Sequence, residues 1–173
     1  MRLGSVPPTR SGLVRASAQL GRMRKGRELL DRKRQALIAE LFRSARPALD
    51  VRQRVDHRAA EAHRALLEAL ATQGEASLRV YAWARRDVEL ELAHHQVWGI
   101  TVPSVRSHTP IRRTLTARET AATAVGPAAA QTAEEFERLV ELVLEALPKE
   151  QLVRRLGEAL RKVTRQVNTL QLR

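Results

Sequence analysis

The sequence predicts an all-α fold, a long antiparallel two-helix coiled coil with a small central β-hairpin head. Apolar residues recur at a three-and-four spacing over two long segments, as in helices that pack along a seam. A short stretch of alternating and β-branched residues lies between these segments. The composition is 43% hydrophobic but only 3% aromatic, which suits a narrow helix–helix seam better than a thick globular core.

The first long helix is expected over residues 9–70. Two consecutive prolines precede Thr9, and because proline cannot continue a helix backwards, Thr9 or Ser11 is the expected N-cap. The apolar spacing then persists for about eight heptads and is ended by the Thr-Gln-Gly sequence at 72–74. Pro47 predicts a kink or a break in this helix.

The second long helix is expected over residues 131–173, opened by a capping box of Thr132 and Glu135. Pro148 shifts the phase of its apolar stripe. Polar residues interrupt the stripe of the first helix at Arg27, Arg34 and Arg52 and are expected to fix the register of the pair. The apolar positions expected to carry the seam are Leu30, Leu37, Leu41, Leu156, Val163 and Leu170.

The head is expected over residues 71–130. Its expected elements, in order, are a short helix (76–85), a strand (88–92), a turn (93–96), a second strand (97–105) and a Ser/Thr/Ala-rich loop (106–130). Gly99 suggests a strand bulge. Trp98 is expected to be buried by head packing, because a two-stranded hairpin needs a surface to cover its large apolar side chains.

The net charge of +12 is unevenly distributed. Residues 1–46 hold 12 basic and 3 acidic side chains, and residues 149–173 hold 7 and 2, whereas residues 131–148 hold 1 and 5. If the long helices pair antiparallel, both basic stretches fall at the same end. This predicts an acidic partner at that end, with nucleic acid as the alternative.

The sequence offers no candidate catalytic, cofactor-binding or metal-binding residues. It has no Cys, which excludes thiolate chemistry, and no Walker-type phosphate loop. His94 and His95 are adjacent and are expected in an exposed turn, since neighbouring strand residues would point to opposite faces. The N-terminus does not resemble a signal peptide, and no apolar run is long enough to span a membrane. We therefore expect a non-catalytic cytoplasmic protein that binds no small-molecule ligand.

Four blocks resemble the D subunit of the V/A-type rotary ATPases and ATP synthases, in the order and at about the spacing of that family. Members read roughly SPTR-x-x-LL, then KG-x-x-LLK-x-KRDAL-x-x-EF, a VWG-x-x-VP hairpin element and a closing TTRRVNALE. The corresponding blocks are PPTRSGLV (7–14), KGRELLDRKRQALIAELF (25–42), VWGITVP (97–103) and LGEALRKVTRQVNTL (156–170).

The resemblance implies a non-catalytic central-stalk shaft. In the family, the D subunit sits inside the hexamer of catalytic A and regulatory B subunits, binds the F and C subunits, and couples ion translocation to ATP synthesis or hydrolysis. It implies a place on the inner face of the plasma membrane without membrane insertion. Family members continue for some tens of residues past the closing motif. Because partner numbers in an antiparallel pair should sum to about 200, residues 9–28 are expected to lack a partner in this chain.

The expected hexamer contact is one helix face carrying Lys25, Arg32, Lys33 and Arg34, which lie beside the second family block. Two other functions fit the charge and the helices alone. One is a basic coiled-coil protein that binds nucleic acid, which would show a steep dependence of affinity on salt. The other is a helical-hairpin adaptor in another assembly.

Overall fold

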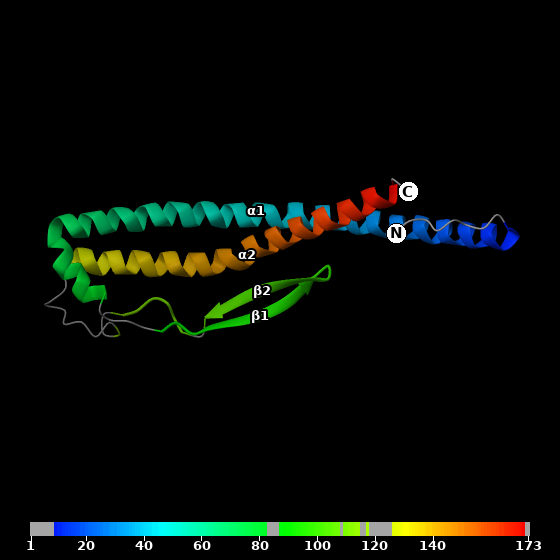
Figure 1. The fold of residues 1–173 in the computed structure, drawn as a ribbon. Coiled ribbons are helices and arrows are strands. Elements are labelled where there is room, and N and C mark those ends of the chain that lie inside the picture. Colours follow the sequence, from blue (N-terminus) through cyan, green and yellow to red (C-terminus); the bar gives the residue numbers. More distant parts are fainter. Residues whose placement is uncertain (1–8, 83–86, 108, 115–116, 118–125, 172–173) are drawn as a thin grey trace. The chain divides into compact units, whose positions relative to one another are not determined.

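The structure, a computed structural model, describes residues 9–82, 87–107, 109–114, 117 and 126–171. Figure 1 shows two long helices joined through a two-stranded antiparallel sheet. The all-α class with a small hairpin is therefore confirmed. The elements are α1 (Arg10–Ala82), β1 (Leu90–Val97), β2 (Ile100–Ser107) and α2 (Pro127–Gln171).

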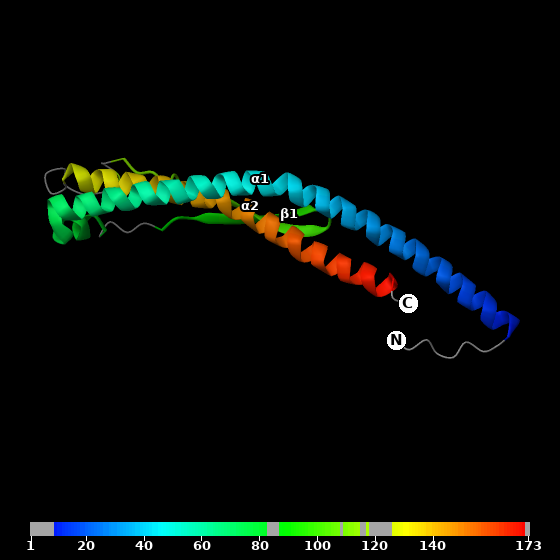
Figure 2. The same ribbon diagram turned by 90° about the horizontal axis from the view of Figure 1, so that it is seen from above.

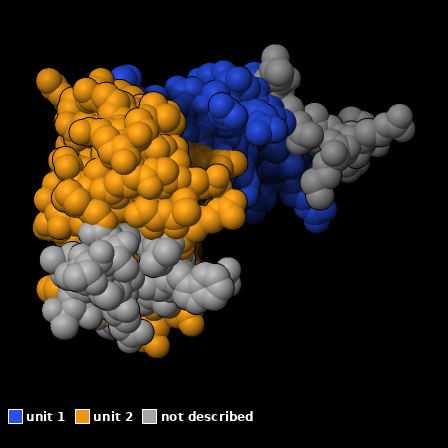
Figure 3. Space-filling view, turned by 90° about the vertical axis from the view of Figure 1, so that its left-hand side faces the viewer, with its two compact units in different colours: residues 1–42, 156–173 blue, residues 43–155 orange. Residues whose placement is uncertain are grey.

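The chain forms two compact units, which Figure 3 shows in different colours. Both long helices, seen from a second side in Figure 2, contribute residues to each unit. Unit 1 comprises residues 1–42 and 156–173, and unit 2 comprises residues 43–155. Unit 2 therefore contains the hairpin, the C-terminal part of α1 and the N-terminal part of α2. Each unit has its own stretch of the helix–helix seam.

Helix α1 begins at the expected cap and is interrupted at the expected position, the Thr-Gln-Gly sequence at 72–74. The Thr9 hydroxyl accepts a hydrogen bond from the Gly12 backbone N–H at 3.1 Å, so Thr9 is the N-cap. The helix does not break at Pro47. Gly74 has non-helical dihedral angles (φ 71°, ψ 166°) and divides the long helix from a short helical piece that ends at Ala82 and overlaps the expected short helix. Glycine takes this conformation without the steric penalty that other residues meet. Residues 83–86, which include the end of the expected short helix, lie outside the described residues.

Helix α2 starts at Pro127, earlier than expected, and a residue of α1 caps it. The side-chain oxygen of Gln73 accepts a hydrogen bond from the Ala129 backbone N–H at 3.2 Å, which satisfies one of the free donors of the first turn. Thr132 is not the N-cap. It lies inside the helix, 5% exposed, and its hydroxyl contacts the carbonyl oxygens of Ala128 and Ala65 at 2.9 Å each. The bond to Ala65 joins α2 to α1.

The seam of unit 2 is built mainly from small side chains. Because alanine lets helix axes approach closely, these residues pack tightly without large apolar groups. Arg52 does not enter the seam as expected; Val51 is buried in its place, and the Arg52 side chain is 59% exposed. The buried residues of this seam are Ala48, Val51, Ala62 and Ala69 on α1 and Ala129, Thr132 and Ala146 on α2.

The seam of unit 1 uses larger residues and largely follows the expected positions. Leu37, Leu156 and Val163 are buried, and Leu30, Leu41 and Leu170 are half-buried. Val167 is also buried and was not among the expected seam positions. Towards the start of α1 the apolar side chains are exposed, with values of 71%, 61% and 53% for Leu13, Val14 and Leu20.

The hairpin turn lies at Trp98 and Gly99, not at residues 93–96. Both residues have positive φ, 52° and 75°, which is the geometry of the two-residue type I′ turns that match the twist of a hairpin. Gly99 is therefore a turn residue and not a bulge. His94 and His95 lie within β1, paired with Pro103 and Val102. Trp98 is 57% exposed and not buried as expected, because the turn position carries its side chain beyond the paired strands.

Candidate docking surface

Cross-helix ion pairs join α1 to α2 in unit 2. Arg52 pairs with Glu150 at 3.4 Å, Arg54 with Glu145 at 3.6 Å, and Arg58 with Glu135 at 2.9 Å. Glu135 is also bound by Arg138 at 2.6 Å. The residue numbers of the cross-helix partners sum to about 200, as the antiparallel register requires. The basic side chains at this seam are thus neutralised within the chain.

Glu145 receives two basic side chains and is ionised more easily than an isolated glutamate. A hydrogen bond from Lys149 at 2.8 Å is the main cause that lowers its pKa, and the charges of Lys149 and Arg54 act in the same direction. Partial burial opposes them and raises the pKa. The carboxylate of Glu145 therefore stays charged across the neutral range, which maintains its link to α1.

Unit 1 carries nearly all of the net charge of the chain. It has 14 basic and 4 acidic residues, a net charge of +10, whereas unit 2 has 17 basic and 15 acidic residues, a net charge of +2. A charge of this density creates a positive potential that attracts acidic surfaces. The excess of basic over acidic residues in this chain therefore lies almost entirely in unit 1.

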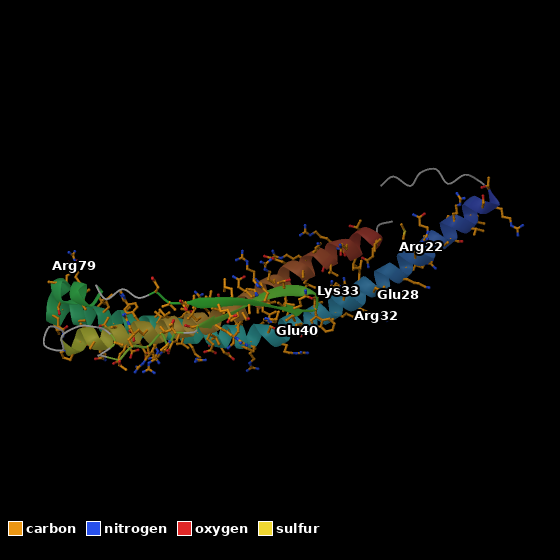
Figure 4. All side chains as sticks on the ribbon, turned by 90° about the horizontal axis from the view of Figure 1, so that it is seen from below. Arg22, Glu28, Arg32, Lys33, Glu40 and Arg79 are labelled. Carbon is orange, nitrogen blue, oxygen red and sulfur yellow. The ribbon has the colours of Figure 1, made fainter. Side chains whose placement is uncertain are left out.

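The structure separates the four expected docking residues. Lys25, Arg32 and Lys33 are exposed, and Figure 4 shows Arg32 and Lys33 on α1. Arg34 is half-buried and pairs with Asp31 at 3.0 Å. Because successive helical residues are about 100° apart around the axis, three consecutive residues cannot share one face. The basic cluster therefore wraps around the helix, and Arg34 serves the fold of unit 1.

Several basic side chains of unit 1 have no acidic partner. In the described part of this unit, Asp31 is shared between Arg27, at 3.7 Å, and Arg34. By contrast, the other exposed basic residues of α1 in this unit, Arg10 and Arg15 included, form no ion pair with any described residue, and we call the five that lie between residues 22 and 33 the free basic cluster. They are Arg22, Arg24, Lys25, Arg32 and Lys33.

Helix α2 adds further positive charge to unit 1. Arg161, Lys162 and Arg165 are exposed, and Arg165 donates a hydrogen bond to the carbonyl oxygen of Arg161 at 3.5 Å. The charge count over residues 149–173 already indicates this contribution, but the expected docking set includes none of these residues. A surface that is basic on both helices can contact a partner that surrounds it.

The described residues contain no group of three or more His, Asp and Glu side chains placed to bind a metal ion. In the same part of the chain, no helix has both the length and the apolar character needed to cross a membrane.

Comparison with known proteins identifies the family. Residues 12–172 match the family model for the D subunit of ATP synthase. The chain is 35% identical over 164 residues to the V-type ATP synthase D subunit of Anaeromyxobacter dehalogenans (strain 2CP-1), covering 94% of this chain and 78% of the relative. It is 32% identical to the V-type D subunit of Thermus thermophilus, covering 98% and 74%, and 31% identical to the A-type D subunit of Methanosarcina mazei, covering 97% and 80%. The chain belongs to the family of ATP synthase D subunits.

Proposed function

We propose that this chain is the non-catalytic central-stalk shaft of a V/A-type ATP synthase or ATPase. The observation that carries the proposal is the free basic cluster of unit 1, on a helix pair that holds +10 of the net charge of +12. Such a helix pair can fill the centre of a ring of subunits and present charge in several directions. Family membership supplies the identity of the assembly.

In this role the chain couples ion translocation through the membrane ring to ATP synthesis or hydrolysis in the catalytic hexamer. The shaft binds no nucleotide and acts by making different contacts with the hexamer in its three orientations. A ligand shifts a conformational equilibrium only by its differential affinity for the states. The partners are the catalytic A and regulatory B subunits, with the F and C subunits of the same complex. The proposed place is the cytoplasmic side of the plasma membrane, peripheral to it.

The basic surface of the shaft would face an acidic inner sleeve of the hexamer. Exposed ion pairs each contribute about 0.2–1 kcal/mol and weaken as salt screens them. The free basic cluster would therefore supply about 1–5 kcal/mol in total, divided among contacts that can break one at a time. We expect the affinity to fall moderately with salt.

Nucleic acid remains the main alternative for a basic helix pair. A protein that neutralises many phosphates loses affinity steeply with salt. However, proteins that bind single strands stack bases on aromatic side chains, and the chain has only two Trp, two Phe and one Tyr. An adaptor in another assembly is the second alternative, and the family match argues against it.

The test compares two triple charge reversals in the full chain. The first variant carries Lys25→Glu, Arg32→Glu and Lys33→Glu. The matched control carries Arg46→Glu, Arg64→Glu and Arg112→Glu, which reverse three exposed charges of unit 2 that form no ion pair with any described residue. Arg52, Arg54 and Arg58 are unsuitable controls, because reversal would break ion pairs between the helices.

The measurement is the affinity of each variant for the purified A and B hexamer, with duplex DNA as a second ligand. We expect the unit 1 variant to bind the hexamer at least tenfold more weakly, and the control to change less than threefold. Equal losses in both variants would contradict the proposed contact. Tighter binding of the unmodified chain to DNA than to the hexamer, with a steep salt dependence, would favour the alternative.

A further inference from the structure

The two strands of the hairpin have unequal free edges. Because the two-residue turn joins Val97 directly to Ile100, these residues form a hydrogen-bonded pair, and hydrogen-bonded and non-hydrogen-bonded pairs then alternate along the ladder. The residues of the non-hydrogen-bonded pairs direct their backbone N–H and C=O groups away from the partner strand. On β1 these residues are Leu90, Leu92, His94 and Gln96, and on β2 they are Thr101, Pro103, Val105 and Ser107.

The free edge of β2 is interrupted. Pro103 lies near its middle, in a non-hydrogen-bonded pair with His94, and it has no N–H to offer to a further strand. Natural proteins protect exposed strand edges in this way, with proline, lysine, bulges or short strands. The edge of β2 is therefore unsuited to pairing.

The free edge of β1 has no such protection. Its outward residues include no proline and no lysine, and the eight residues of β1 pair one-to-one with β2, so the ladder contains no bulge. Among the described residues, none donates a hydrogen bond to or accepts one from the outward backbone groups of Leu90, Leu92, His94 or Gln96. The four outward-facing residues of β1 are thus available to pair with a further strand.

The outer face of the hairpin is apolar beside the start of β1 and polar towards the turn, where it carries His94, Gln96 and Thr101. Leu90 and Leu92 are 46% and 64% exposed, and Val105 pairs with Leu92 on the same face. The opposite face carries Val102, which is 1% exposed and so is already covered. An added strand with apolar residues at alternate positions would extend the exposed face and cover Leu90 and Leu92.

The local charge indicates what kind of segment fits. Three acidic residues, Asp87, Glu89 and Glu91, lie at or just before the start of β1; Glu91 is opposite Arg106 in the ladder, whereas Asp87 and Glu89 precede the ladder. Asp87 and Glu89 attract basic side chains, whereas a second copy of the chain is repelled by its own net charge. Basic residues on the added strand would lie near Asp87 and Glu89, both exposed.

We propose that the β1 edge takes up an extended segment of a different protein in the same complex, which adds a third strand to the hairpin. The segment has apolar residues at every second position and basic residues at the end near Asp87 and Glu89. The inference rests on the proposed function, because the complex supplies the other protein. Main-chain hydrogen bonds provide affinity in this mode, and alternate side chains provide specificity.

The test measures amide hydrogen exchange of the full chain, free and in the reconstituted complex with its A, B, C and F subunits. In the free chain the inward amides of Ala93 and His95 should be protected, and the outward amides of Leu92 and His94 should exchange quickly. In the complex we expect the outward amides to slow at least tenfold. Outward amides that exchange equally fast in both states, or slowing at Thr101 and Val105 instead, would overturn the proposal.

Two variants separate the edge from the hairpin fold. Leu92→Pro removes one outward N–H from β1 without removing a β1–β2 hydrogen bond, and Thr101→Pro does the same on β2. We expect Leu92→Pro to weaken assembly about tenfold and Thr101→Pro less than twofold, with Ala93 and His95 still protected in both free variants. Equal assembly of the two variants would contradict the edge pairing.

Two further outcomes would also count against it. Protection of the β1 edge in the free chain that rises with protein concentration would assign the edge to a second copy and overturn the proposal. Failure of the unmodified chain to assemble with the four other subunits would overturn both the shaft function and the edge pairing. Assembly with an unprotected edge would overturn only the edge pairing.

Discussion

The seam of unit 1 makes a quantitative prediction for two leucines of the same helix. Leu37 is fully buried, at 0% exposure, and Leu29, about two turns earlier, is 65% exposed. Truncating each to alanine removes the same atoms from the same kind of backbone. The difference between the two variants therefore isolates the effect of packing against α2.

The expected magnitude follows from the burial of each side chain. Leucine to alanine removes three carbons, worth about 2.4 kcal/mol at about 0.8 kcal/mol per buried methylene. Fully buried leucines lose about 2–5 kcal/mol in all, because a cavity remains. A two-helix seam can partly close over the gap, so we expect Leu37→Ala to lower the free energy of unfolding by about 2–3 kcal/mol. Leu29→Ala should lower it by less than about 1 kcal/mol, since about one third of its side chain is buried.

The assay is thermal unfolding of the full chain followed by far-ultraviolet circular dichroism. At about 2–4 °C per kcal/mol for a chain of this size, Leu37→Ala should lower Tm by about 4–12 °C and Leu29→Ala by less than about 4 °C. Equal shifts in the two variants would refute the assignment of Leu37 to a helix–helix seam. A larger shift for Leu29→Ala would place the seam on the face of α1 that carries Leu29.

Three further predictions concern unit 2. Gln73→Ala removes the cap of α2 and should lower the free energy of unfolding by about 1 kcal/mol, measured by urea unfolding; an unchanged midpoint would show that the cap is not formed. Because the pKa of Glu145 is lowered in the folded chain, its contribution to stability is present above its unfolded pKa and is lost as pH falls through the folded pKa. Lys149→Gln should make this loss of stability smaller, measured by unfolding experiments below pH ~5. A pH profile of stability that the substitution leaves unchanged would contradict the pairing. Gly99→Val places a β-branched side chain at φ 75° and should destabilise the hairpin by about 1 kcal/mol or more. The expected readout is faster amide exchange at His95 with unchanged helical content, and unchanged exchange would contradict the turn geometry.

Local signals in the sequence were sufficient where the structure depends on neighbouring residues. Thr9 caps α1 because the required donor lies three residues later. The start of α2 depends instead on Gln73, 56 residues before the Ala129 N–H that it caps, so the local pair of Thr132 and Glu135 was misleading. The hairpin turn was misplaced because its first residue is Trp98, a side chain that seldom takes positive φ.

The candidate docking surface was only partly predictable for a similar reason. The charge counts correctly place an excess of basic residues in the segments that form unit 1. They do not reveal which residues are neutralised, because that depends on the register between the helices. Arg58 reaches Glu135 across the seam and Arg34 reaches Asp31 within a turn, whereas Lys25 and Arg32 pair with no described acidic residue. Only the folded chain separates these cases.

The central claim is that this chain turns inside a ring of subunits, and single-molecule rotation tests it most directly. The complex would be immobilised through its A and B hexamer, with a visible probe attached to the chain at the exposed residue Arg79 of unit 2. On addition of ATP we expect the probe to rotate in one direction with three dwell positions per turn. A probe that stays fixed while the same complexes hydrolyse ATP would contradict the account.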